Sequence, residues 1–391
     1  MIGLTLAVGP LLVASAAVPP STLGFDSPRS ETSRASLPTA EETRMLYAQG
    51  LVAVMTSREK AAAVVMGHIP STNPTEASNY MRATGVGGFI LMGANVGSTA
   101  EDVRALTAAL TIDPALPPLI AIDQEGGDVS RLEWDTAASA LSLASSDVAA
   151  VTAAFAERGA IVAQTGISVN FGVVADWTAD PNSFISRRVL GTDPAAAAER
   201  VAAAVAGEAD FVASTLKHFP GHGAAPGDSH QTIPLAEMSR EQWNTTEALP
   251  FVAGIDAGAP LVMFGHLEYS AVDTAPASLS VVWHDILRDD LGFNGVSVTD
   301  DMGMLESSGL AQYQDPVENA IVALLAGNDL VLGVNYSSVE RANAVIDGIA
   351  AAVESGRIPV ERIDDAATRV LALRLSVPAS AAPCPECAPA N

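Results

Sequence analysis

Short apolar runs alternate with alanine-rich stretches along most of the chain. Seven runs have the length and composition of strands: 87–92, 118–122, 168–174, 211–216, 260–264, 295–299 and 329–332. An eighth strand is possible around 62–66, where the pattern is weaker. Because these runs lack alternating polar positions, we expect strands buried on both faces, as in a parallel sheet. Helices are predicted between them at 99–110, 147–165, 194–208, 240–257, 316–326 and 338–355.

This alternation predicts an α/β fold, a TIM-type (β/α)8 barrel with a single catalytic domain. A doubly wound parallel sheet is the alternative that the pattern leaves open. Polar clusters favour the barrel, because a barrel gathers the carboxyl ends of its strands around one mouth. They follow the strand ends at 123–131, Asp176, 217–230, His266 and Asp300. A last helix is expected at 363–375.

The ends of the chain differ from its centre. Residues 1–17 are apolar with small residues at 14–16, which predicts a signal peptide, although no Lys or Arg follows Met1. Residues 18–42 are predicted as a flexible Ser/Thr/Pro-rich linker, 43–376 as the barrel domain and 377–391 as a Pro/Ala/Cys tail. We therefore expect a secreted or cell-envelope protein. No cysteine follows the expected cleavage site, and no membrane span is expected in the mature chain.

Composition and charge limit the possible partners. The 391 residues carry a formal net charge of −25, so the basic surface that nucleic-acid binding requires is absent. The chain has two lysines, and one of them, Lys217, lies in a dense polar segment. The two cysteines, Cys384 and Cys387, are in the tail and lack the further ligands of a zinc site. We expect a tail disulfide or a free pair without a catalytic role.

The densest polar segment is 217–230, which holds three of the six histidines. It follows the run 211–216 and is predicted as a loop. Asp228 can orient the imidazole of His230 and stabilise its protonated form, which would make it a general acid. Two other interpretations compete. The segment could be a polar loop without chemistry, or a metal site, although its spacing matches no zinc signature. The metal ligands would then be His218, His222, Asp228 and His230.

Two further strand ends carry charged groups. Asp123 follows the run 118–122, and the Gly126-Gly127 turn can return Arg131 to the same mouth. This pair could bind sugar hydroxyls or could simply hold the turn together. Asp300 and Asp301 end the run 295–299, and only one of two successive strand residues can readily face the mouth. A carboxylate there can attack an anomeric carbon, or it can cap the next helix.

Together these segments resemble glycoside hydrolase family 3, in its β-N-acetylglucosaminidase branch. The characteristic loop KHFPGHG at 217–223 is followed four residues later by DSH at 228–230. Further matches are DQEGGDVSR at 123–131, RRVLGTDP at 187–194, GHLEYSAVDTAPASLS at 265–280, LGFNGVSVTDDMGM at 291–304 and AGNDLVL at 326–332. The resemblance covers roughly residues 45–375 in the expected order.

The resemblance implies a role for each matched residue. Asp300 matches the nucleophile, and His230 with Asp228 matches the acid/base dyad. Five residues match the positions that hold the terminal sugar in subsite −1: Asp123, Arg131, Arg188, Lys217 and His218. His222 is assigned a role in shaping the loop, and three residues are expected to support the site: Glu125, His266 and Asp301. No metal or organic cofactor is required.

The activity implied is that of a retaining exo-β-N-acetylglucosaminidase. Its partner would be a GlcNAc-containing glycan or muropeptide, and it would release terminal GlcNAc from peptidoglycan fragments or chitooligosaccharides through a covalent glycosyl-aspartate. Phosphorolysis is one alternative, because a neutral histidine base does not repel phosphate as a carboxylate would. A broader β-glucosidase or xylosidase of the same family is another. A non-catalytic carbohydrate-binding protein is the alternative of a different class.

The chain departs from the family pattern at three points. Ala224-Ala225 stands where the family usually has Asp-Thr, and 170–174 replaces the usual run before the Asp-Trp pair. A second domain, which carries a different acid/base in other members, has no counterpart here. The Ala224-Ala225 change bears on the resting position of the loop 217–230 and leaves the expected catalytic residues unchanged.

Overall fold

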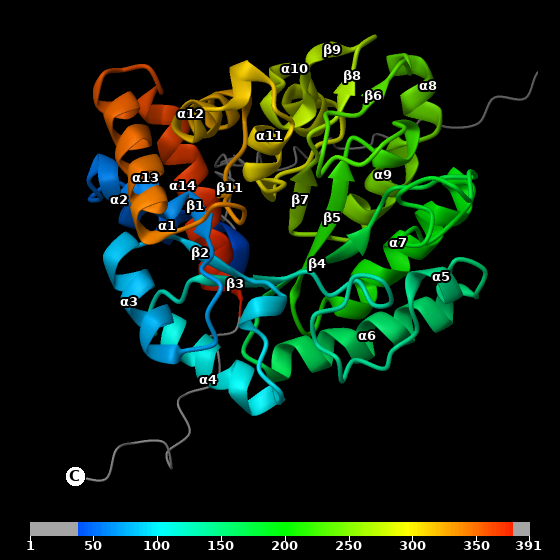
Figure 1. Ribbon diagram of the computed structural model, residues 1–391, viewed down its shortest axis with the longest axis horizontal. Coiled ribbons are helices and arrows are strands. Elements are labelled where there is room, and N and C mark those ends of the chain that lie inside the picture. Colours follow the sequence, from blue (N-terminus) through cyan, green and yellow to red (C-terminus); the bar gives the residue numbers. More distant parts are fainter. Residues whose placement is uncertain (1–37, 378–391) are drawn as a thin grey trace, which may run out of the picture. The chain divides into compact units, whose positions relative to one another are not determined.

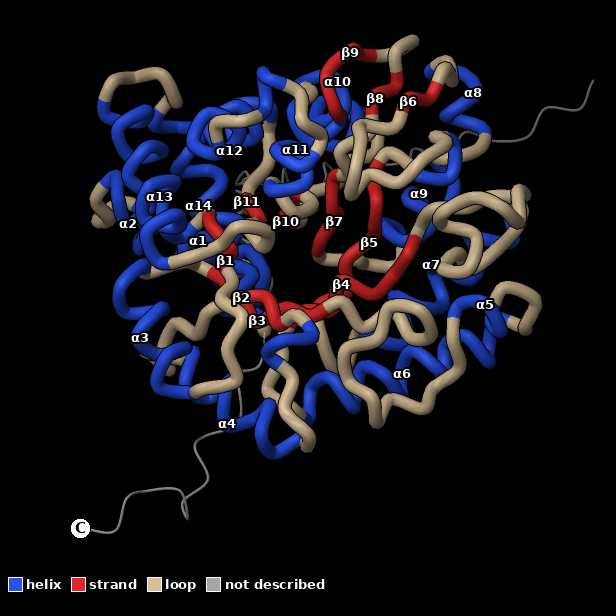
Figure 2. The backbone as a smooth tube through the Cα atoms, in the orientation of Figure 1, coloured by secondary structure: helices blue, strands red, loops and turns tan. Residues whose placement is uncertain are grey.

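The computed structural model describes residues 38–377. The predicted signal peptide, most of the predicted linker, and the tail with Cys384 and Cys387 lie outside the described residues. Eight strands form a ring surrounded by helices (Figures 1 and 2). They are β1 (Val65–Gly67), β2 (Gly88–Leu91), β3 (Leu119–Ile122), β4 (Val169–Val174), β5 (Ala213–Phe219), β7 (Leu261–Phe264), β10 (Val296–Thr299) and β11 (Val331–Leu332).

The strands pair in chain order, and every pair is parallel. The sheet runs β10-β7-β5-β4-β3-β2-β1-β11, so β1 pairs with both β2 and β11. The remaining seam lies between β10 and β11. It is closed by one bridge from Val298 to Leu330 and by a 3.1 Å hydrogen bond from the Thr299 N–H to the Leu330 carbonyl. The predicted TIM-type barrel is therefore confirmed.

Helices cover the outside of the ring. They are α1 (Ala40–Val52), α2 (Ser57–Ala63), α3 (Pro74–Thr84), α4 (Ala100–Leu110), α5 (Ala140–Leu143), α6 (Val148–Gln164), α7 (Pro194–Glu208), α8 (Arg240–Thr245), α9 (Ala248–Asp256), α10 (Val281–Asp285), α11 (Gly303–Ser307), α12 (Pro316–Ala326), α13 (Val339–Glu354) and α14 (Val360–Ser376). Side chains that point inward fill the barrel, among them Met66, Phe171 and Leu261. No helix within 38–377 is long and apolar enough to span a membrane.

Four predicted boundaries were wrong. Helix α1 begins at Ala40, inside the predicted linker, and α2 occupies the start of the predicted strand 62–66. The predicted helix 240–257 is two helices, interrupted at Thr246, whose ψ of −88° is not helical. Adjacent β-branched Thr245 and Thr246 have low helix propensity, which favours a break there. Strand β5 runs on to Phe219, so Lys217–Phe219 belong to the strand rather than to a loop.

A small second sheet was not predicted. It consists of β6 (Leu235–Ala236), β8 (Glu268–Tyr269) and β9 (Asp273–Pro276), in the order β6-β8-β9. Its strands have two to four residues, too few for a hydrophobic pattern to appear in the sequence. In Figure 1 it lies beside the carboxyl ends of β5 and β7.

The barrel seam is reinforced by one buried carboxylate. Asp329 is fully buried and accepts hydrogen bonds from Arg288 at 2.5 Å and Arg362 at 3.0 Å, and from the backbone N–H of Ser297 at 3.0 Å. Arg369 lies 3.3 Å away. Burial alone would raise the pKa of Asp329, but the three guanidinium groups lower it below its ordinary value. The carboxylate thus joins β10, β11 and α14.

Replacing Asp329 with alanine should lower the free energy of unfolding by about 3–5 kcal/mol, because three clustered arginines lose their buried counter-ion. Urea unfolding of the two proteins measures this difference. Asp347→Ala is the control, because its 2.9 Å pair with Arg58 is exposed and should contribute less than about 1 kcal/mol. Equal losses in the two variants would contradict the role given to the seam carboxylate.

Candidate active site

A cavity of about 400 Å³ opens at the carboxyl ends of the strands. This volume lies within the range of small-molecule sites, and this end of a barrel is where active sites are built. All but one of the predicted site residues line it: Asp123, Arg131, Arg188, Lys217, His218, His230 and Asp300. Asp228 is bonded to His230. Residues from β3, β5, β10 and two loops therefore meet in one place.

The floor of the cavity is a buried ion network centred on Lys217. Its Nζ lies 3.0 Å from Asp123 Oδ1 and 2.6 Å from Glu125 Oε1. Arg188 donates two hydrogen bonds to Glu125, at 2.8 and 2.7 Å. The side chains of Lys217 and Glu125 are 3% and 1% exposed, so water does little to screen these charges. The network joins the ends of β3 and β5 to the segment before α7.

These contacts decide the charge states of the floor. Burial would raise the pKa values of Asp123 and Glu125, but the cationic Lys217 and its neighbouring guanidinium groups outweigh it. The pKa of Glu125 falls to about 2, and that of Asp123 also falls below its ordinary value. Burial opposes the charge on Lys217 as well, but its two carboxylates raise its pKa. Both carboxylates and the ammonium are therefore ionised near neutral pH.

The turn after β3 delivers Arg131 to the cavity as predicted. Gly126 and Gly127 have φ of 83° and 79°, which only glycine adopts readily. The side chain of Gln124 accepts the backbone N–H of Arg131 at 2.8 Å and so fixes the return of the chain. Arg131 Nη2 lies 3.5 Å from Asp123 Oδ2. The two interpretations of this pair are therefore compatible, because the ion pair itself faces the cavity.

His218 and His222 share one buried carboxylate, Asp176, which follows β4. Asp176 Oδ2 lies 2.7 Å from His218 Nδ1, and its Oδ1 accepts the backbone N–H of His222 at 2.6 Å. His222 Nε2 lies 3.1 Å from Ser229 Oγ, which links the start of the loop to its tip. Burial lowers the pKa of His222 despite the nearby carboxylate. These contacts agree with a loop-shaping role for His222.

Asp300 ends β10, and its carboxylate accepts the N–H of Asp301 at 2.8 Å. Burial would raise the pKa of Asp300, but His218, His266, Lys217 and that N–H together lower it. Asp300 is therefore an anion at the edge of the cavity. The neighbouring Asp301 carboxylate instead accepts three backbone N–H groups, from Gly303, Val334 and Asn335.

The dyad is more exposed than the floor. His230 Nδ1 lies 2.7 Å from Asp228 Oδ1, and the His230 side chain is 59% exposed. Asp228 also accepts the backbone N–H of His230 at 3.0 Å. Because Nδ1 is engaged by the carboxylate, Nε2 is the ring nitrogen left to exchange a proton with a bound molecule. Within residues 38–377, no three His, Cys, Asp or Glu side chains are gathered as metal ligands.

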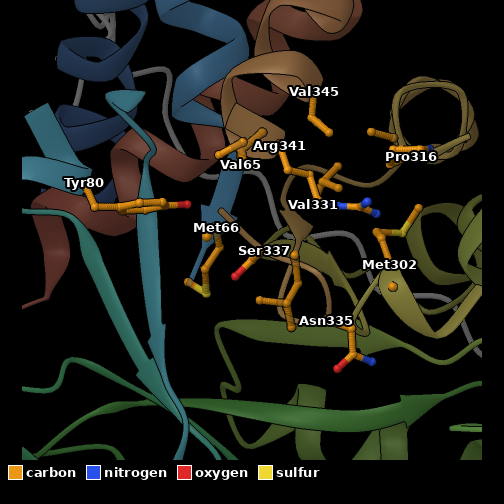
Figure 3. A pocket seen from close by; sticks show the side chains of 16 residues that line it. Val65, Met66, Tyr80, Met302, Pro316, Val331, Asn335, Ser337, Arg341 and Val345 are labelled. Atoms are coloured by element: carbon orange, nitrogen blue, oxygen red, sulfur yellow. The ribbon is translucent and has the colours of Figure 1, made fainter. Parts of the chain in front are cut away.

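A smaller cavity lies next to the active-site cavity and is mostly apolar (Figure 3). Met66, Val331 and Val345 are among its lining residues, and Leu332 and Asn335 line both cavities. The hydroxyl of Tyr80 is buried there without a hydrogen-bond partner among the described residues. The segment after β11 thus separates two spaces and is held in place by Asp301.

Sequence reasoning missed several residues of the site. Asp176 was noted only as a polar group at a strand end. Phe184 and Asn335 line the cavity but gave no signal, because a single aromatic or amide in a loop has no characteristic spacing. Glu247 is 2% exposed, and its Oε2 has no hydrogen-bond partner within the described part of the chain. A Cβ on Gly221 would lie 2.7 Å from that oxygen, so the loop backbone packs directly against the carboxyl group.

Comparisons with known proteins agree with this geometry. The model for the glycosyl hydrolase family 3 N-terminal domain matches residues 56–373. Beta-hexosaminidase A of Pseudoalteromonas piscicida is 32% identical over 348 residues, which are 80% of this chain and 57% of that protein. A beta-hexosaminidase of Stenotrophomonas maltophilia is 33% identical over 281 residues, 69% of this chain and 82% of the relative. The chain thus spans little more than half of the first relative.

Among the solved structures similar to this chain is one that shares both its fold and much of its sequence. It is a glycoside hydrolase family 3 beta-N-acetylglucosaminidase from Paenibacillus sp. str. FPU-7, with a TM-score of 0.76 and 35% identity. The match covers 82% of this chain and 62% of the Paenibacillus chain. The similarity therefore extends over the barrel and leaves more than a third of that protein without a counterpart.

Glu247→Gln should change how stability depends on pH. Burial and the neighbouring Asp176 raise the pKa of Glu247 to about 9, so the folded protein holds a proton that the unfolded chain releases above about pH 4.5. The contribution of this protonated carboxyl group to the free energy of unfolding is complete below pH 4.5 and is lost as the pH rises toward 9. Between pH 5 and pH 8, urea unfolding should show the variant gaining roughly 4 kcal/mol relative to the unmodified protein.

The same substitution at exposed Glu237 is the matched control. A pH-independent difference between Glu247→Gln and the unmodified protein would show that Glu247 is ionised in the folded state.

Proposed function

The chain belongs to glycosyl hydrolase family 3, and from this premise we propose that it is a retaining exo-β-N-acetylglucosaminidase. The supporting observation is that Asp300 and His230 line one sugar-sized cavity above a buried ionic floor. An anionic carboxylate and an imidazole held by Asp228 are the nucleophile and the acid/base that a retaining displacement requires. A cavity of about 400 Å³ suits one terminal sugar and hence exo action.

The floor is suited to holding a sugar ring by its hydroxyl groups. Asp123 and Arg131 provide an acceptor and a donor at one strand end, and Arg188, Lys217 and His218 provide further donors or acceptors. All of them are held by partners in the network, so they need little reorganisation when a sugar binds. Fixed polar groups of this kind favour binding of one sugar in one orientation.

In the first step, an Asp300 carboxylate oxygen attacks the anomeric carbon and the bond to the leaving oxygen breaks. His230, as imidazolium, transfers its Nε2 proton to that oxygen, so the aglycone leaves as an alcohol. The anomeric carbon is then bound to Asp300 as a glycosyl ester. The imidazole is neutral, and its Nδ1 side is held by Asp228 throughout.

In the second step, water attacks the same carbon from the face that the aglycone has left. Neutral His230 accepts a proton from the water, the ester bond to Asp300 breaks, and the sugar is released with its original anomeric configuration. The imidazolium and the carboxylate are regenerated, so the cycle consumes one water and requires no redox or metal chemistry.

We infer the substrate class from the relatives. Two are named beta-hexosaminidase and one structure is described as a beta-N-acetylglucosaminidase. Muropeptides and chitooligosaccharides both end in GlcNAc, and a secreted or cell-envelope protein would meet either. Product analysis on muropeptides and chitobiose side by side distinguishes the two aglycones.

The exposed dyad also favours a second candidate, phosphorolysis. After the first step, His230 is neutral and an anionic acceptor meets less repulsion than it would from a glutamate base. Asp228 supplies one negative charge, but its Oδ1 is engaged by the imidazole. Formation of N-acetylglucosamine 1-phosphate in phosphate buffer would identify this reaction, and its absence would leave hydrolysis.

Asp300→Ala should lower kcat for 4-nitrophenyl N-acetyl-β-glucosaminide by roughly 10⁴-fold or more, because the neighbouring carboxylates Asp123 and Glu125 are paired with Lys217. Release of nitrophenol measures the rate, and the exposed, remote Asp113→Ala is the matched control. Near-normal turnover by Asp300→Ala would eliminate Asp300 as the nucleophile.

His230→Ala should affect substrates according to the acidity of their leaving groups. We expect kcat/KM to fall by roughly 10²-fold or more for a 4-methoxyphenyl glycoside, whose leaving oxygen needs a proton, and much less for the 4-nitrophenyl glycoside. Both substrates place one aromatic ring in the aglycone position. A uniform loss on the two substrates would count against His230 as the acid.

A further inference from the structure

The loop that carries the dyad is firmly attached at its beginning. The Pro220 carbonyl accepts the indole N–H of Trp243 at 2.7 Å, and the Gly221 carbonyl accepts the Tyr269 hydroxyl at 2.5 Å. The backbone N–H of His222 is bound by Asp176. These three partners come from separate parts of the barrel domain, so the position of residues 220–222 is well determined.

The tip of the loop is attached differently. Within the described chain, every hydrogen bond made by residues 227–231 goes to the loop itself. Asp228 binds His230, and Ser229 binds His222. These bonds fix the internal shape of the tip. The Ser229–His222 bond ties the middle of the tip to the fixed start of the loop, but no hydrogen bond from outside the loop reaches Asp228 or His230 within the described chain.

Phe184 supplies a contact from outside the loop. It lies in the segment between β4 and α7, lines the active-site cavity and is 40% exposed. Its ring centroid is 5.8 Å from that of His230, at an interplanar angle of 67°, and 5.5 Å from that of His222. The Arg188 guanidinium lies 5.8 Å from the same ring. One phenyl ring therefore touches the acid/base and the start of its loop.

We propose that Phe184 is a positioning residue that holds the Asp228–His230 dyad over the cavity by an edge-to-face contact with the His230 ring. This inference rests on the proposed function, because it concerns the delivery of His230 to the glycosidic oxygen. An aromatic pair of this geometry changes an equilibrium by roughly 2- to 10-fold. Without the ring, the loop tip spends more time away from the cavity, where His230 cannot protonate a leaving group.

The contact has a selective consequence for catalysis. Phe184 meets the Lys217 network only at Arg188, among the described residues, and Arg188 is held independently by its two hydrogen bonds to Glu125. Loss of the ring should therefore leave the nucleophile and the sugar-binding floor intact. Only the steps in which His230 donates or accepts a proton should slow.

The test compares Phe184→Leu with Phe184→Tyr on 4-nitrophenyl and 4-methoxyphenyl N-acetyl-β-glucosaminides. The leucine variant should lose about 5- to 10-fold in kcat/KM on the methoxyphenyl glycoside and less than about 2-fold on the nitrophenyl glycoside. The tyrosine variant keeps the ring and should retain both activities. Azide, which attacks without a general base, should accelerate turnover of the nitrophenyl glycoside by the leucine variant alone.

Controls separate this role from others. Tyr47→Leu removes an exposed aromatic on α1, away from the cavity, and should change neither ratio. Equal losses on the two glycosides in Phe184→Leu would indicate aglycone stacking or a general structural role and would overturn the proposal, as would no loss. An unmodified protein inactive on both glycosides would overturn the proposed function itself, and this inference with it.

Discussion

The site depends on one buried cation. Lys217 lies between two carboxylates that burial would otherwise neutralise, and through Glu125 it is joined to Arg188. Opposite charges this close offset the cost of removing them from water only if every partner is present. The ends of β3 and β5 and the segment before α7 are therefore fixed together. Lys217 also lowers the pKa of Asp300. One cation therefore holds the floor together and helps to keep the proposed nucleophile ionised.

The groups proposed to hold the sugar and the proposed acid are attached to the barrel in different ways. The groups proposed to hold the sugar come from strand ends and are interlocked, whereas the dyad is at the tip of a loop whose hydrogen bonds are internal. A substrate can enter while the tip is away and react when it lies over the cavity. The start of the loop is bound to Asp176, Trp243 and Tyr269, which limits how far the tip can travel.

The fold was predictable because buried parallel strands are continuously apolar and their ends are polar. The same rule misplaced the end of β5, because Lys217 and His218 are buried polar residues whose partners are distant in the sequence. Asp123, His230 and Asp300 were identifiable from motifs, and Arg131 from its glycine turn. Phe184 and Glu247 were not, because their importance lies in contacts with residues 38 to 71 positions away, such as His222 and Asp176, that only the folded chain brings together.

Exposure distinguishes His230, the proposed acid, from the other histidines nearby. Burial lowers the pKa values of His222 and His266, which disfavours the protonated form that an acid needs. The His230 side chain is 59% exposed, and its Nδ1 lies 2.7 Å from the Asp228 carboxylate, so it is not enclosed as the other two are. Asp300 has the opposite requirement, since it must stay anionic, and it is surrounded by cationic and N–H groups. The chain thus places the proposed acid in an exposed loop and the proposed nucleophile in a buried position among cationic and N–H groups.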